Sequence, residues 1–156
     1  MCVQLPPTMK EYVWMFGSLS ELDELQYVSE MVNNTVRKLP QEVQSALSDW
    51  QRRRLIDAIV KSQEFVRDVL RDAAYVSLRD VARCLRIMEW LLSNELKHAT
   101  SKQWIERATV QALALVYYFR LDSLNRVRYA KRITPDVIGR IAWFQSRDFQ
   151  TVCCGD

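Results

Sequence analysis

The sequence contains few of the residues that form turns or active sites. Its 156 residues include only 3 glycines, 4 prolines and 1 histidine. So few glycines and prolines disfavour a turn-rich β fold and favour long helices. The single histidine, His98, lies in a polar stretch, and a catalytic histidine needs a nucleophile and an orienting acid nearby. We therefore interpret His98 as a surface residue.

The cysteines do not form a metal-binding pattern. They stand at positions 2, 84, 153 and 154, without C-x-x-C spacing and without a second cysteine–histidine pair, so the sequence gives no zinc site to propose. We interpret them as reduced thiols. The N-terminus lacks a basic region followed by an apolar core, and the longest apolar run, 110–119, is shorter than the about 20 residues that cross a bilayer. We expect a cytoplasmic chain without a transmembrane segment, and a part of a longer protein.

Phosphate-binding motifs are missing as well. No G-x-x-x-x-G-K-[ST] loop occurs, and no apolar strand ends in paired acids, so the chain alone has neither a Walker A nor a Walker B element and is not expected to be an enzyme by itself. The net charge is +3 and the pI is about 8.7. Nucleic-acid-binding domains usually have a pI above about 9. We expect no nucleic-acid partner.

Helical periodicity dominates what is present. Apolar residues recur at helical spacing, and no stretch alternates long enough for a convincing strand, so the predicted fold class is an all-α bundle. We treat 1–156 as one helical domain with three parts: a leading segment (1–20), a first set of helices (20–94) and a following set (102–146). The first expected helix starts after Ser18 or Ser20. Further helical stretches cover 41–72, with a bend near Arg52–Arg54, and 77–93, 102–121, 122–131 and a last stretch from Thr134-Pro135 through Phe144. Residues 10–16 form either a short helix or a strand near Val13.

The most informative stretch begins at Val76. Ser77 can cap a helix, and Asp80, three residues later, can accept hydrogen bonds from exposed backbone N–H groups. Arg79 is unusual, because a cation at a helix N-terminus opposes the helix dipole. Its position favours an anion outside the helix, such as a phosphate. The alternative is a structural ion pair with an acid such as Asp72.

Three runs carry a resemblance to a known family. The run VSLRDVARCLRIMEWL (76–91) is similar to the lid helix of the AAA+ modules in the mysterin family, which are giant RING-type E3 ubiquitin ligases with a dynein-like AAA+ core. Residues 5–8 with 13–20, and the apolar run 112–118, resemble flanking parts of the family in the same order.

The resemblance implies a helical lid and a linker to the next module, with Arg79 as a nucleotide sensor supported by Ser77 and Asp80. Arg83 is then a second candidate phosphate contact. ATP and Mg would be held by adjoining AAA+ domains of the parent chain, which would also engage the ubiquitin machinery. Two positions depart from the family pattern, since Ala82 and Met15 stand where acids are common. Either departure is compatible with a weakened module, for example one in which Arg79 binds nucleotide without supporting turnover, and the sequence leaves open whether ATP is hydrolysed.

Other interpretations remain open from the residues. A stand-alone all-α protein–protein interaction domain would display an exposed apolar groove, and a basic nucleic-acid binder would lose affinity steeply with salt. Two basic runs are interpreted mainly as solvated faces; they are Arg52–Arg54 with Arg83 and Arg86, and Arg126, Arg128, Lys131 and Arg132. The five tryptophans are interpreted as packing residues rather than a base-stacking platform.

Overall fold

A computed structural model describes residues 19–71, 76–94 and 102–138 of the chain. Within these ranges every regular element is helical and no strand occurs, which confirms the predicted all-α class. The helices are α2 (Glu21–Lys38), α3 (Gln41–Ala46), α4 (Asp49–Leu70), α5 (Leu78–Asn94), α6 (Lys102–Val116) and α7 (Ser123–Ile138), with a 3₁₀ turn, η2 (Tyr118–Arg120), between the last two. None of these helices combines the length and apolarity that a bilayer crossing requires.

Helix α2 begins at Ser20. The Ser20 hydroxyl accepts a hydrogen bond from the backbone N–H of Asp23, and the first turn is acidic while the last turn is basic. This distribution complements the helix dipole at both ends. Of the two caps proposed from the sequence, the structure uses Ser20; Ser18 and the candidate element at 10–16 lie outside the described residues.

The stretch predicted to be helical over 41–72 is helical, but it is interrupted near Leu47 and not at the bend predicted near Arg52–Arg54. Ser48 forms a reciprocal capping box with Gln51, which starts a new helix at Asp49. The chain thus turns between α3 and α4, and α4 ends at Arg71 in the left-handed conformation (φ 51°). The side chain of Leu47 is buried at this turn, so packing reinforces the break.

Two further boundaries differ from the prediction. The helix expected to run to Leu121 stops at Val116 and tightens into the 3₁₀ turn η2, which carries Arg120. Thr134 and Pro135 do not start a separate helix, because α7 continues to Ile138. Pro135 removes one i→i−4 backbone hydrogen bond, three residues before α7 ends. The helix is already started by Asp122, whose carboxylate accepts a hydrogen bond from the Asn125 N–H at 2.9 Å.

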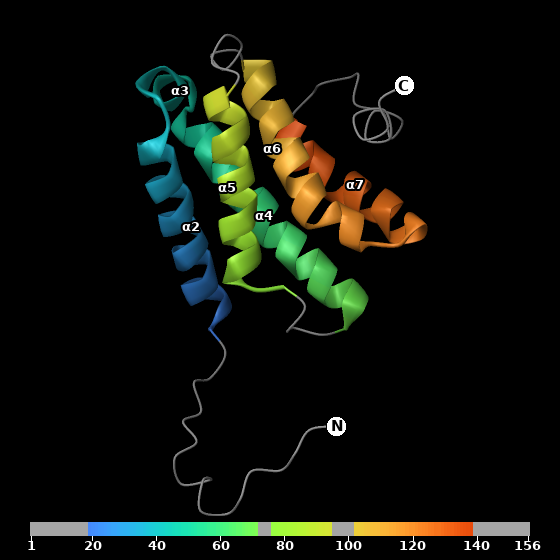
Figure 1. The fold of residues 1–156 in the computed structure, drawn as a ribbon. Helices are drawn as coiled ribbons and strands as arrows, with labels where there is room; N and C mark the ends of the chain where they lie inside the picture. The colour runs from blue at the N-terminus through green and yellow to red at the C-terminus, as the bar shows by residue number, and fades with distance from the viewer. Residues whose placement is uncertain (1–18, 72–75, 95–101, 139–156) are drawn as a thin grey trace, which may run out of the picture.

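The helices form two packed layers. In Figure 1, α2, α5 and α6 stand beside one another while α4 passes behind α5, and α7 lies against α4 and α6. The core between them is mainly aliphatic, with three large aromatic residues, Phe65, Tyr117 and Tyr129. The Tyr129 hydroxyl lies 2.7 Å from the Ser62 hydroxyl, and its ring packs edge-on against Phe65. This hydroxyl pair joins α7 to α4 within the core.

Ile59 offers a test of this packing, because it lies in the middle of α4 with 0% of its surface exposed. Ile59→Ala should lower the free energy of unfolding by about 2–5 kcal/mol through lost burial and a residual cavity. Urea unfolding of both proteins measures the difference. Leu22→Ala is the control, because Leu22 is 79% exposed and its truncation should change stability by less than about 0.5 kcal/mol. Equal effects of the two substitutions would contradict the placement of α4 at the centre.

Candidate functional site

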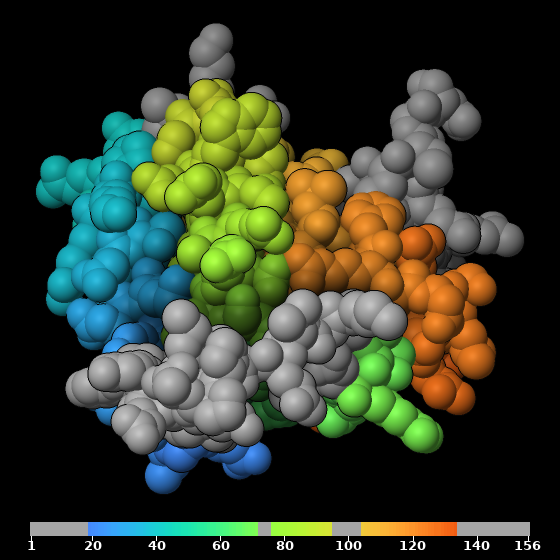
Figure 2. Space-filling view, turned by 60° about the horizontal axis from the view of Figure 1, so that its bottom comes forward, coloured from blue at the N-terminus to red at the C-terminus, as the bar shows by residue number. Residues whose placement is uncertain are grey.

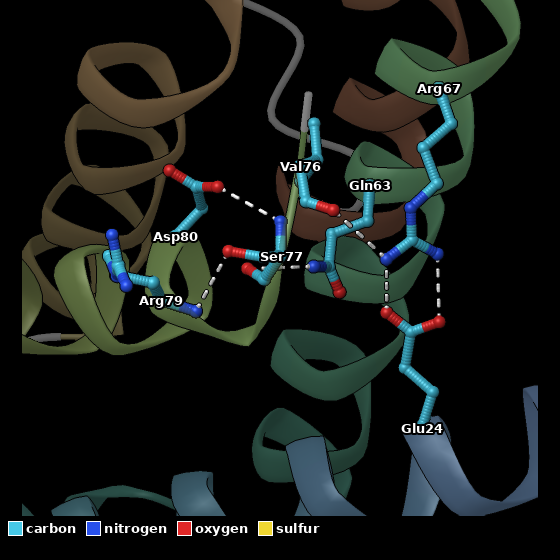
Figure 3. A network of polar contacts seen from close by, with 7 residues as sticks. All are labelled: Glu24, Gln63, Arg67, Val76, Ser77, Arg79 and Asp80. Atoms are coloured by element: carbon cyan, nitrogen blue, oxygen red, sulfur yellow. Dashed lines mark hydrogen bonds and ion pairs between the residues drawn. The ribbon is translucent and has the colours of Figure 1, made fainter. Parts of the chain in front are cut away.

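The start of α5 is fixed by hydrogen bonds among Ser77, Arg79 and Asp80. The backbone N–H of Ser77 donates to the Asp80 carboxylate at 3.0 Å, and the backbone N–H of Arg79 donates to the Ser77 hydroxyl at 3.3 Å. Figure 3 shows both contacts. The cap predicted between Ser77 and Asp80 is therefore present, and it sets the position from which the Arg79 side chain leaves the helix.

Asp80 has a second partner that the sequence did not reveal. Its side chain is 8% exposed and accepts a hydrogen bond from the Arg120 guanidinium of η2 at 2.5 Å, while Arg83 lies 3.6 Å away. Burial alone would raise the pKa of the Asp80 carboxyl. The hydrogen bonds from Ser77 and Arg120 and the charge of Arg83 outweigh burial and hold this pKa below its usual value. Asp80 is thus a buried carboxylate that joins the start of α5 to the end of α6.

Arg79 lies on the outside of the same turn. Its side chain is exposed and forms no ion pair with any residue in the described ranges. In Figure 3 its guanidinium points away from the Glu24–Arg67 pair on the other side of Ser77. Asp72, the alternative structural partner, falls outside the described residues. Arg83 differs from Arg79 in that it forms a long ion pair with Asp80, at 3.6 Å.

A partly buried polar cluster supports the segment that leads into α5. Arg67 of α4 forms two hydrogen bonds with the Glu24 carboxylate of α2, at 2.8 and 2.5 Å, and a long contact of 3.4 Å with the carbonyl of Val76. Gln63, also of α4, donates to the Ser77 carbonyl at 3.3 Å. Figure 3 shows how these groups converge from three elements. Because Glu24 and Arg67 are 43 residues apart, sequence spacing gave no signal for this pair.

The two basic runs are divided among local contacts. Arg52 pairs with Asp49 at 3.6 Å, and Arg54 stacks over the Trp50 ring at 4.4 Å. In the second run, Arg132 lies 3.8 Å from Glu64, and Arg126 donates to the Phe119 carbonyl. Neither run forms one undivided cationic surface. The tryptophans are predicted to pack in the core or at an interface. Trp50 is 54% and Trp90 63% exposed, so these two do not pack in the core.

Cys84 is the cysteine that the described ranges contain. It is fully buried between helices, and burial raises the pKa of its thiol to about 12. A thiol in this state is a poor nucleophile and a poor metal ligand. Among the described residues, no group of three or more His, Cys, Asp or Glu side chains is arranged to hold a metal ion. His98 lies outside these ranges.

Comparison with known proteins finds that this all-α segment is similar to short stretches of E3 ubiquitin-protein ligases. It is 28% identical over 129 residues to E3 ubiquitin-protein ligase rnf213-beta of Danio rerio, covering 76% of this chain and 2% of the relative. It is 29% identical over 142 residues to E3 ubiquitin-protein ligase RNF213 of Homo sapiens, covering 81% of this chain and 3% of that protein. It is 30% identical over 86 residues to E3 ubiquitin-protein ligase RNF213 of Mus musculus, covering 55% of this chain and 2% of that protein.

These matches confirm the resemblance to the mysterin family, because the chain is similar to a short stretch of RNF213 ligases. It spans only about 2–3% of the length of these relatives. No family model and no solved structure matches the chain.

The buried Asp80 carboxylate predicts a pH dependence of stability. Because its folded pKa lies below the unfolded value of about 3.9, its contribution is fully present above that value and is lost as the pH falls through the folded pKa. Asp80→Asn should therefore unfold about 1–3 kcal/mol more easily at pH 7. The difference should shrink below about pH 4.

Urea unfolding at pH 7 and at pH 3 measures this change. Asp122 also has a lowered pKa, because the backbone N–H of Asn125 donates to it. It titrates equally in both proteins, so it cancels from the difference. A difference that is the same at both pH values would show that the Asp80 charge does not contribute.

The Glu24–Arg67 pair should couple α2 to α4. Its side chains are 17% and 26% exposed, so water screens it less than a surface ion pair. In a double-mutant cycle with Glu24→Gln and Arg67→Met, we expect a coupling energy of about 1–2 kcal/mol, above the 0.2–1 kcal/mol typical of exposed pairs. The Arg52–Asp49 pair is the matched control and should couple by less than about 0.5 kcal/mol. Equal coupling in the two cycles would contradict a special role for Glu24–Arg67.

Proposed function

We propose that this chain is the helical lid and linker of a AAA+ ATPase module in a mysterin-type E3 ubiquitin ligase. In this proposal Arg79 senses the nucleotide and couples its state to a change in conformation. The observation that carries it is an exposed arginine, without an ion pair in the described ranges, at the tightly capped start of α5. The similarity to RNF213 ligases supports the part of the proposal that assigns the chain to a larger E3 ubiquitin ligase.

The polar groups around Arg79 make the guanidinium the group available to an anion. The backbone N–H groups of Ser77 and Arg79 are already used within the cap. The Asp80 carboxylate is turned inward to Arg120, so its negative charge is compensated inside the protein. A phosphate approaching from outside therefore meets the Arg79 side chain, as in other sites where charge is stabilised by a positioned arginine.

A hollow on the other side of the same segment is lined mainly by negatively charged side chains, in contrast to the positively charged Arg79. The space between α2 and α4, of about 340 Å³, is lined by the carboxylates Glu21, Glu24, Glu64 and Asp68 together with Arg67 and Val60. Four carboxylates around a single guanidinium repel phosphate. This contrast supports the exposed side of α5, rather than the hollow, as the nucleotide-facing side.

The contacts behind Arg79 provide a route for coupling. Ser77 is held by Gln63 of α4, and Asp80 is held by Arg120 of η2. A force on Arg79 would act on this tied turn and would move α4, α5 and η2 together rather than distort a loose loop. Lids of this kind move as rigid bodies and gate a site at a domain boundary. The γ-phosphate of ATP with its Mg would supply the charge that this proposal requires Arg79 to sense.

The partners of the chain follow from the same proposal. Adjoining AAA+ domains of the parent would hold ATP and Mg, and the ubiquitin machinery would act through the parent in the cytoplasm. Arg83 is proposed as a secondary phosphate contact, which its ion pair with Asp80 weakens. The second candidate function is a protein–protein interaction domain without catalytic activity. Exposure of large side chains such as Trp90 favours this alternative.

Replacement of Arg79 tests the lid proposal in the full-length parent protein. Arg79→Ala should raise the apparent Kd for ATP or lower ATP turnover by about 10-fold or more, because loss of a positioned arginine removes charge stabilisation at the phosphate. Nucleotide binding by calorimetry and phosphate release measure the two effects separately. Arg53→Ala is the matched control, since Arg53 is exposed on α4 far from the α5 start. Unchanged ATP binding and turnover in Arg79→Ala would favour the interaction-domain alternative.

A further inference from the structure

The outer face of α5 carries a continuous stripe of charged and aromatic side chains. Arg79, Arg83, Arg86 and Trp90 are all exposed, and they follow one another at intervals of four, three and four residues. At 100° per residue, these positions lie within about 60° of one another around the helix. The stripe, called here the α5 outer stripe, is about 16 Å long. In Figure 2 the yellow-green surface of α5 is open between α2 and α6.

The stripe is positively charged with little compensation. Arg86 forms no ion pair with any described residue, and Arg83 is 61% exposed and reaches only Asp80, at 3.6 Å. Asp80 is itself buried and already bound to Arg120. Glu89, the other acid of α5, lies about 90° from the centre of the stripe by helical geometry. The outward face therefore presents guanidinium groups one turn apart and no carboxylate between them.

Trp90 is the last residue of the stripe, and its side chain does not pack in the hydrophobic core. The inner face of α5 is formed by Val81, Leu85, Met88 and Leu92, all at most 3% exposed, whereas Trp90 is 63% exposed. A tryptophan beside arginines is the composition that is enriched at the centres of protein–protein interfaces. Exposure of so large an apolar surface adds nothing to folding stability, so a partner that covers it would gain binding energy.

We propose that the α5 outer stripe binds an acidic helical segment of another protein or domain. Carboxylates one helical turn apart would pair with Arg83 and Arg86, because guanidinium groups bind carboxylates through two parallel hydrogen bonds. An apolar side chain of the same segment would cover Trp90. The stripe does not fit nucleic acid as well, since three aligned cations on a chain of net charge +3 would release few counterions. It lacks the broad apolar face of a membrane-bound helix.

This inference does not rest on the proposed nucleotide sensing, because its test measures peptide binding in the absence of nucleotide. The variants leave Arg79 in place and change Arg83, the proposed secondary phosphate contact, only together with Arg86. The probe is a capped, fluorescein-labelled helical peptide with glutamates spaced i, i+3, i+7 and a leucine at i+11, titrated with the protein and followed by fluorescence anisotropy. We expect Arg83→Glu/Arg86→Glu to weaken binding at least 10-fold. Trp90→Ala should weaken it about 5-fold. Raising the salt concentration should weaken binding by the unchanged protein more than binding by the double variant.

The matched control makes the same change of charge on α7. Arg128→Glu/Lys131→Glu replaces two exposed cations and should change affinity less than 2-fold. Far-ultraviolet circular dichroism verifies that every variant stays helical. Equal loss in the two double variants would overturn the proposal, because it would show a response to net charge alone. Equal affinity for a peptide of scrambled order, or tighter binding to a DNA duplex or to phosphatidylserine vesicles, would also overturn it.

Discussion

The buried carboxylate of Asp80 is the group on which the arrangement around α5 depends. It accepts from the Ser77 backbone at the start of α5 and from Arg120 at the end of the α6–η2 segment. A buried carboxylate without partners is costly, so its presence requires both contacts. It therefore fixes where α5 begins and where α6 must stop. The tight turn η2 agrees with this constraint, because it ends at Arg120, whose guanidinium donates to Asp80.

A second set of polar contacts holds the segment that precedes α5. Arg67 links Glu24 of α2 to the carbonyl of Val76, and Gln63 holds the carbonyl of Ser77. Together with Asp80, these contacts join α2, α4, α5 and η2 at one corner of the bundle. The exposed residues Arg79, Arg83, Arg86 and Trp90 are therefore displayed on a helix whose own start is held from behind. A rigid support of this kind is what a sensing arginine or a docking surface requires.

Local signals in the sequence predicted the helices well where a cap and a periodic stripe agreed. Ser20 and Ser77 mark helix starts because their hydroxyls satisfy backbone N–H groups in the first turn. Prediction failed where tertiary packing outweighed the local signal. The Thr134-Pro135 pair has the form of a helix start, yet α7 runs through it because Tyr129 and Ile133 continue its buried face. The break at Ser48 was missed, although its capping box with Gln51 was present in the sequence.

The all-α class, the cap of α5 and the similarity to RNF213 ligases could be predicted from the sequence, because helical periodicity, capping residues and sequence similarity are local properties of the chain. Which polar residues meet depends instead on how the helices pack. Arg120 reaches Asp80 across 40 residues, and Arg67 reaches Glu24 across 43, distances at which no spacing rule applies. The exposure of Trp90 was likewise decided by packing, since a tryptophan at helical spacing reads as a core residue until its neighbours are placed.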